Sequence, residues 1–153
     1  MVRRLPPQLA AQLIALGRRY GIDQLGLDED GEVVLSFEDG IEVGLACSGP
    51  LSDLRLYCQI GALPPRPESE LLVELLQFNR VCAEPDGAVV GLTDDDPPQI
   101  LAAQRVDWRG LPVADFVAAA EDFVNLVEDL HALCRESVSA TPGLPPGTMN
   151  LRG

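Results

Sequence analysis

The stretch from residue 68 to residue 79 reads ESELLVELLQFN and carries more large apolar side chains than one helix face needs. At about 100° per residue, one side of such a helix gathers Leu71, Leu75 and Phe78. Leu72 and Leu76 fall on a second side about 100° away, and Val73 lies further round. A surface helix normally has a single apolar stripe, which packs on its own core. The second apolar side predicts either that the helix is buried deep in the core or that it contacts another subunit.

The flanking sequence favours the subunit contact. Three prolines (Pro64, Pro65 and Pro67) precede this helix, and the turn sequence EPDG follows it. A short helix between such breaks is expected at the periphery of the fold, where a second apolar side remains uncovered by its own chain.

The rest of the chain predicts an α+β fold. Apolar residues at helical spacing predict a first helix from about Pro6 to Tyr20 and a last helix from about Pro112 to Arg135. Alternating apolar residues predict strands in QLGLD, EVVLSFE, IEVGLAC and LRLYCQI, then in AVVGLT and QILAAQRV. The expected order is α-β-β-β-β-α-β-β-α, a curved antiparallel sheet flanked by three helices. We expect one domain over residues 1–138 and a flexible Pro/Gly/Ser-rich tail over 139–153.

Charge and composition narrow the function classes. The 153 residues include 24 acidic and 11 basic side chains, a net charge of −13. Such a field repels nucleic acid and anionic membranes, so neither is an expected partner. No apolar run approaches the roughly 20 residues of a membrane span, and the N-terminus lacks a signal-peptide core, so we expect a cytoplasmic protein. The four cysteines form no C-x-x-C pair and are interpreted as buried thiols.

No motif predicts catalysis. The single histidine, His131, flanks the apolar stripe of the last helix and has no recognisable nucleophile in its vicinity. GLDEDGE (26–32) lacks the Lys and Ser/Thr of a phosphate loop and the final Glu of a calcium loop, which leaves a hairpin turn. Asp94, Asp95 and Asp96 precede two prolines and are interpreted as a solvated turn. We therefore expect no enzyme activity, no cofactor and no metal site.

The layout of the chain resembles the class I type III secretion chaperones. The matching features are the helix ending LGRRYGI, the stretch LGLDEDGEVVLSFEDGIEVGL, the strand and turn LRLYCQIGALP, the helix LLVELLQFN, the region GAVVGLTDDDPPQILAAQRVDWRGL and the helix FVAAAEDFVNLVEDL. These features cover about residues 5 to 136. The family is defined by this layout more than by invariant residues.

The resemblance implies a bacterial homodimer that binds the N-terminal segment of a secreted effector in extended form and keeps it soluble and export-competent. It implies a dimer contact through Leu72, Val73, Leu76 and Asn79. Apolar patches for the effector are expected on the flank of the first helix and on the outer face of the sheet. Their residues are Ala10 and Ile14 on the helix, and Val34, Ser36 and Tyr57 on the sheet.

One alternative remains open at this stage. An acidic inhibitor or nucleic-acid mimic that binds a basic partner would share the charge of this chain. Such a protein would carry its carboxylates in a line with helical spacing.

Overall fold

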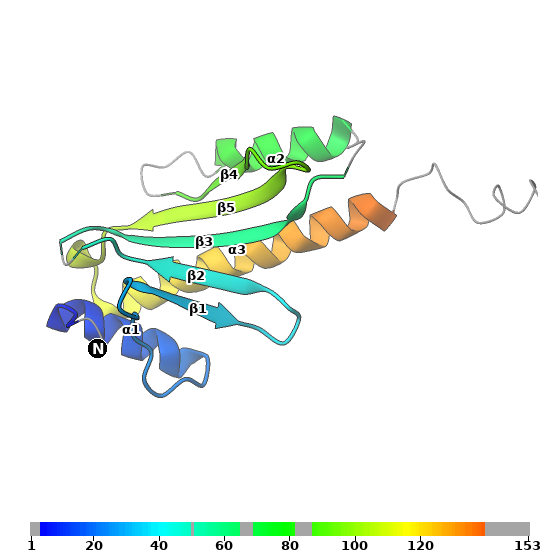
Figure 1. Cartoon of the computed structure of the whole chain (residues 1–153). Helices are drawn as coiled ribbons and strands as arrows, with labels where there is room; N and C mark the ends of the chain where they lie inside the picture. The colour runs from blue at the N-terminus through cyan, green and yellow to red at the C-terminus, as the bar shows by residue number, and fades with distance from the viewer. Residues whose placement is uncertain (1–3, 50, 65–68, 82–86, 140–153) are drawn as a thin grey trace, which may run out of the picture.

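The computed structural model describes residues 4–49, 51–64, 69–81 and 87–139. Within them the chain forms three α-helices, five strands and a short 3-10 helix, η1 (Figure 1). The elements, in chain order, are α1 (Pro7–Arg19), β1 (Glu32–Ser36), β2 (Glu42–Ala46), β3 (Leu54–Ala62), α2 (Ser69–Val81), β4 (Val89–Leu92), β5 (Gln99–Val106), η1 (Trp108–Gly110) and α3 (Val113–Ser139).

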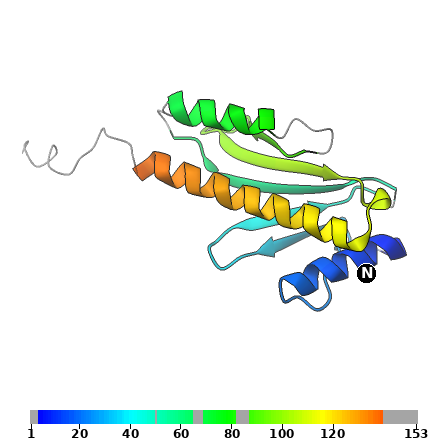
Figure 2. The same ribbon diagram turned by 180° about the vertical axis from the view of Figure 1, so that it is seen from behind.

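The sheet has the strand order β1-β2-β3-β5-β4, and every neighbouring pair is antiparallel. A register shift between Gln59 and Gly61 interrupts the long β3–β5 pair, and such bulges bend a sheet. Helix α3 runs along one face of the sheet, while the opposite face carries none of the described helices (Figures 1 and 2). Helix α1 lies beside β1, and α2 lies beside β4 at the other edge (Figure 1).

The expected α+β class is confirmed, and the elements follow in the expected order with one difference. Residues 24–28 join no strand ladder, although their side chains alternate in exposure as a strand does. Leu25 and Leu27 are buried, whereas the N–H group of Asp28 bonds the carbonyl of Glu32 and so closes a turn. The alternation correctly indicates which side chains enter the core, but the backbone of this segment has no ladder partner in the described chain.

The core lies between the inner face of the sheet, α1 and α3. Its largest side chains with almost no exposure include Leu9, Leu13 and Leu16 of α1, Leu45, Leu54 and Leu56 of the sheet, and Phe116, Phe123 and Leu130 of α3. The spacing of three and four residues along each helix and of two along each strand places these side chains on one side of their element. Burial of each such side chain stabilises the fold by about 1.5–3 kcal/mol.

Two glutamines fasten α1 to η1. The amide nitrogen Nε2 of Gln12 donates to the carbonyl oxygens of Trp108 and Leu111, both at 2.8 Å, and Gln12 is fully buried. Gln8 donates to the Trp108 carbonyl at 3.0 Å, one turn earlier in α1. The indole N–H of Trp108 donates to the Ser52 carbonyl at 2.8 Å. These hydrogen bonds join α1, the η1 segment and the β2–β3 loop.

Several expectations fall outside this description. The flexible tail lies, from residue 140 onward, outside the described residues, as do Cys82 and most of the turn EPDG. The domain limits therefore stay a prediction, although α3 continues to Ser139, beyond the expected end at Arg135. None of the described helices is long and apolar enough to cross a membrane.

Candidate binding site

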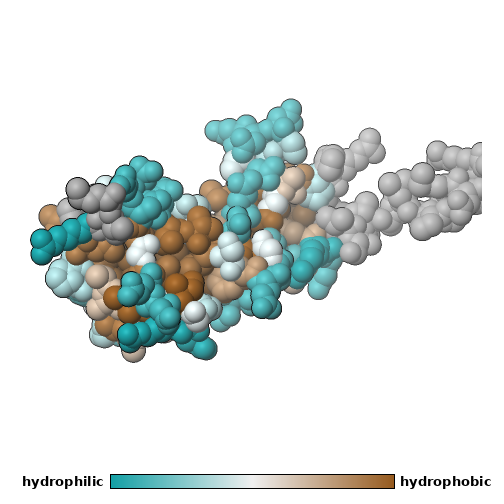
Figure 3. All heavy atoms as spheres, turned by 60° about the horizontal axis from the view of Figure 1, so that its bottom comes forward, coloured by the Kyte–Doolittle hydropathy of each residue, from teal (hydrophilic) through white to brown (hydrophobic). Residues whose placement is uncertain are grey.

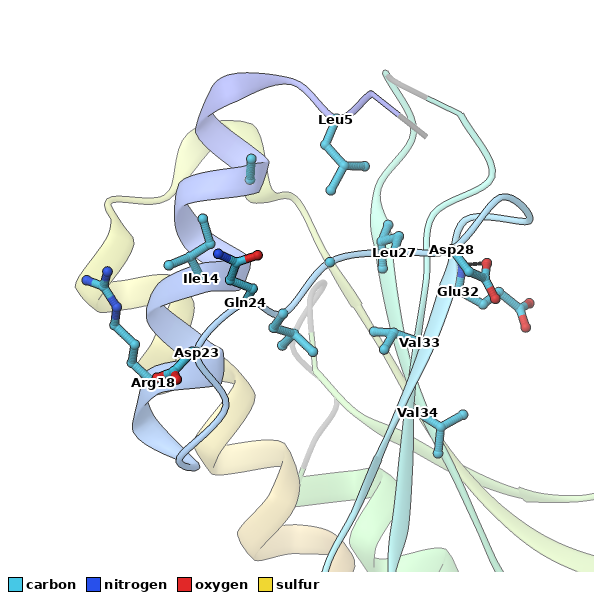
Figure 4. Close-up of a pocket in the computed structure, with 13 residues that line it drawn as sticks. Leu5, Ile14, Arg18, Asp23, Gln24, Leu27, Asp28, Glu32, Val33 and Val34 are labelled. Atoms are coloured by element: carbon cyan, nitrogen blue, oxygen red, sulfur yellow. Dashed lines mark hydrogen bonds between the residues drawn. The ribbon is translucent and has the colours of Figure 1, made fainter. Parts of the chain in front are cut away.

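A groove of about 770 Å³ runs between α1 and β1. Its walls come from α1 (Ala10, Ile14 and Arg18), the connection (Asp23 to Asp28) and β1 (Glu32, Val33 and Val34), with Leu5 at one end (Figure 4). Figure 3 looks onto this side of the molecule and shows apolar side chains gathered there, with hydrophilic groups around them. The groove therefore offers apolar surface to a partner and has a charged rim.

The groove follows from two stripes on one helix. Leu9, Leu13 and Leu16 point into the core, whereas Ala10 and Ile14 are offset from them by about 100° and are half-buried. The segment that connects α1 to β1 runs beside this second side of the helix. Its buried residues Leu25 and Leu27 form the floor of the groove. Val34 forms the opposite wall on β1 and is 50% exposed.

The backbone of β1 is open toward the outer edge of the sheet. The N–H of Phe37 donates to the carbonyl of Ile41, and the N–H of Cys47 donates to the carbonyl of Gly31. Because hydrogen-bonded residues alternate along an antiparallel pair, Val33 and Leu35 are the residues of β1 whose backbone groups bond β2. The N–H and C=O groups of Val34 and Ser36 therefore point away from β2. At Glu32 the corresponding groups are already bonded to Asp28. Within the described part of the chain, two residues of β1 thus have backbone groups without a ladder partner near the apolar groove.

The opposite edge of the sheet carries an apolar patch, which we call the α2–β4 patch. It consists of Leu72, Val73 and Leu76 on α2 and Leu92 on β4. Leu76 is 68% exposed and Val73 is 50% exposed, so the second side of the ESELLVELLQFN helix is not covered by the described chain. A cavity of about 200 Å³ with almost wholly apolar walls lies between α2 and β4 within this patch.

The nine residues expected in binding sites separate into three groups. Ala10, Ile14 and Val34 meet in the groove, and Leu72, Val73 and Leu76 share the α2–β4 patch. Asn79 lines the cavity within that patch, and its carboxamide bonds the backbone of Val90 in its own chain. Ser36 lies further along β1, and Tyr57 lies on the outer face of the sheet; neither lines the groove.

Sequence reasoning missed other residues of both surfaces. Leu5 and the segment from Gln24 to Leu27 line the groove, because a connection without a ladder partner runs beside α1. Leu92 extends the α2–β4 patch, and its signal in the sequence is an apolar residue on a short strand at the sheet edge. Periodicity indicates a strand, but it does not indicate which strand lies at an edge.

The titratable groups show no catalytic arrangement in the part of the chain that is described. Burial, helped by Arg135, lowers the pKa of His131, and its Nε2 atom is buried with no hydrogen-bond partner. Burial raises the pKa of the Cys58 thiol to about 11, which favours the unreactive thiol at neutral pH. No group of three or more His, Cys, Asp or Glu residues suited to a metal ion is found among the described residues.

The solvent side of α3 carries a line of acidic residues. Asp115, Asp122, Asp129 and Glu136 follow one another at seven-residue intervals, and all are exposed. This line is the feature that an acidic inhibitor or nucleic-acid mimic would show. It coexists with the groove and the α2–β4 patch, which such a mimic does not need.

This α+β fold has an apolar groove at one sheet edge and an apolar patch at the other, two surfaces suited to contact with other chains. The sequence matches the model of the Tir chaperone protein (CesT) family over residues 12–131, and the chain belongs to this family. It is a chaperone of the type III secretion class, as its layout indicates. Proteins of this family bind effectors and are not enzymes, and this membership confirms the expected absence of enzyme activity.

Solved structures share the fold at low sequence identity. The ExsC–ExsE complex contains a chain with a TM-score of 0.65 and 20% identity, over 83% of this chain and 93% of that one. The Yersinia pestis chaperone SycH, in complex with a fragment of YscM2, gives 0.60 and 16%, over 79% and 98%. The ExoU–SpcU complex of Pseudomonas aeruginosa gives 0.56 and 20%, over 82% and 97%. No similar sequence was found among the curated proteins.

Proposed function

We propose that this protein is a cytoplasmic bacterial chaperone that binds the N-terminal segment of a secreted effector in extended form. Binding keeps the segment soluble and competent for export. The observation that carries this proposal is the apolar groove between α1 and β1, which lies beside the unpaired backbone groups of Val34 and Ser36. An extended chain can add to such an edge by backbone hydrogen bonds and place alternate side chains in the groove.

The similar structures support an effector as the partner. SycH is described in complex with a fragment of YscM2, and SchA is described in a chaperone–effector complex with HopA1. Ordering an extended segment costs conformational entropy, which the burial of apolar side chains must offset. A groove of about 770 Å³ has room for several such side chains.

The functional unit in this proposal is a homodimer joined through the α2–β4 patch. Leu76 and Val73 lie exposed on α2, and Leu92 continues the apolar area on the neighbouring strand. A second copy covers this area by a two-fold contact, in which the same patch serves both partners. The groove and the patch lie at opposite edges of the sheet, so dimerisation leaves both grooves accessible.

Co-expression tests the groove directly. The probe is the first 100 or so residues of the protein encoded by the adjacent reading frame, because chaperones of this family are commonly encoded beside their cargo. We expect the probe to stay soluble and to co-purify with the wild type but not with Ile14→Asp. The matched control is Ile22→Asp, because Ile22 is 36% exposed and lies outside the groove.

Hydrogen exchange locates the bound segment. We expect binding to slow exchange at the amides of Val34 and Ser36, since these become bonded to the added strand. Co-purification that survives Ile14→Asp, without protection of these two amides, would contradict the proposal.

A further inference from the structure

The outer face of the sheet carries an aromatic ring that extends toward the groove. Val34, Gly44 and Tyr57 stand opposite one another on three neighbouring strands. The ring of Tyr57 lies over Gly44, where a Cβ atom would stand 2.1 Å from Cζ of the tyrosine. Glycine at position 44 thus lets the ring reach across β2 toward β1. Tyr57 and Val34 together continue the apolar surface from the groove onto the open face.

Two carboxylates stand beside this ring. Glu32 lies on the same side of β1 as Val34, two residues earlier, and Asp28 precedes it in the turn. Burial raises the pKa of the Tyr57 hydroxyl, and the negative charges of Glu32 and then Asp28 raise it further. Both carboxylates line the groove (Figure 4).

The charge at this end of the groove is not balanced by arginine. No ion pair joins Glu32 or Asp28 to an arginine within the part of the chain that is described. Arg18 lines the groove on α1, against three acidic side chains, those of Asp23, Asp28 and Glu32. Arg55 shares the outer face with Glu32, but Ala46 stands between them, which separates the two by two strand spacings, or about 10 Å.

We propose that the chain held in the α1–β1 groove carries a lysine or arginine where it passes the start of β1. The cation lies against the face of Tyr57 and pairs with Glu32 and Asp28, while neighbouring apolar side chains enter the groove. This inference rests on the proposed function and adds a preference in sequence to it. In this inference the acidic charge has a specific role at one place, because Tyr57, Glu32 and Asp28 together recognise one basic residue of the bound segment.

The expected size of the preference follows from two known effects. A cation over an aromatic face and an ion pair at a partly exposed site each contribute modestly. Together they should favour the basic residue over an uncharged one of similar length by about tenfold in Kd. The advantage should shrink as salt is added, because exposed charges are screened.

Peptide selection tests the preference with the full-length protein. A phage-displayed library of random 16-residue peptides is selected on the wild type, on Glu32→Lys and on Asp122→Lys. The last variant makes the same change of charge on the exposed side of α3. We expect wild type and Asp122→Lys to select alternating apolar residues with a basic residue at one fixed position. Glu32→Lys should lose that basic residue and select an acidic one there.

The selected peptide and its Lys→Met or Arg→Met derivative are then compared by fluorescence anisotropy at low and high salt. Apolar peptides without a fixed basic residue, or equal affinity of the two peptides at low salt, would overturn this inference and leave the groove as the binding site. Peptides whose binding is unchanged by Ile14→Asp would overturn the proposed function and this inference with it.

Discussion

The carboxamide of Asn79 bonds both backbone groups of Val90. Oδ1 accepts the Val90 N–H at 2.6 Å, and Nδ2 donates to the Val90 carbonyl at 2.7 Å. Val90 lies on the edge strand β4, and the alternation of the β4–β5 ladder turns these two groups away from the sheet. The side chain of Asn79 therefore takes the place that a further strand would occupy. The edge of β4 is closed at this point by α2 itself.

Replacement of Asn79 by alanine should expose that edge. Loss of the two bonds leaves both Val90 groups without their partner and should lower the free energy of unfolding by about 1–3 kcal/mol. Urea denaturation measures the change, and light scattering follows the association that open strand edges promote. Asn79→Asp keeps the acceptor for the N–H but places an oxygen against the Val90 carbonyl. A denaturation midpoint for Asn79→Asp equal to that of the wild type would show that the second bond contributes nothing.

Substitution of Gly44 by alanine should displace the ring of Tyr57. The new Cβ would meet ring carbons at 2.1–2.5 Å, so the ring has to move off β2. Overpacking of this kind costs about 1–3 kcal/mol of folding stability, measured by urea denaturation. The double variant Gly44→Ala/Tyr57→Ala should lose less than the sum of the single changes, because the clash is absent. Strict additivity would contradict the contact.

Charge on the α2–β4 patch should separate the proposed dimer. Val73→Glu and Leu76→Glu place a carboxylate where a partner would cover it, so both should run as monomers with unchanged helix content. Size-exclusion chromatography with light scattering gives the mass, and circular dichroism checks the fold. Val113→Glu is the matched control, since Val113 is 42% exposed on α3, away from the patch. A monomeric wild type, or two dimeric patch variants, would refute the interface.

The stability should fall with acid through His131, the single histidine. Burial, with a smaller contribution from Arg135, lowers the pKa of His131 below its ordinary value of 6.5, while Asp39 acts in the opposite direction. The unfolded chain therefore binds the proton more readily than the folded one. The stabilisation is present above pH 6.5 and is lost as the pH falls from there to the lowered pKa. Urea denaturation at several pH values should show a smaller loss for His131→Gln over this window; equal slopes would contradict the assignment.

Helices and most strands could be predicted because the spacing of their apolar residues matches the side of the element that is buried. The first helix and the helix at residues 69–81 lie within a few residues of the expected bounds, since an apolar stripe cannot be shifted without exposing it. Residues 24–28 show the limit of this signal. Leu25 and Leu27 are buried as in a strand, but hydrogen bonding to a neighbour depends on where the rest of the chain runs.

The candidate site was predictable only in part, for the same reason. Ala10 and Ile14 were found from the flank of a helix stripe, and Val34 from the outward side of a strand. Their meeting in one groove depends on the order of strands in the sheet, which places β1 at an edge beside α1. The place of Asn79 at a subunit contact stays a prediction; the structure adds that its carboxamide bonds the backbone of β4, a tertiary contact that no local pattern encodes.

The hydrogen bonds of Gln8 and Gln12 to the η1 segment also have a consequence for the release of the proposed effector. The Gln12 side chain is fully buried and donates to two carbonyl oxygens, which holds α1 against η1. We expect α1 to keep this position when a chain binds, so that the ordering cost falls mainly on the bound segment. Because these bonds hold α1 in place, we expect release of the proposed effector segment to need a pulling force on the effector, which withdraws its side chains from the groove one at a time.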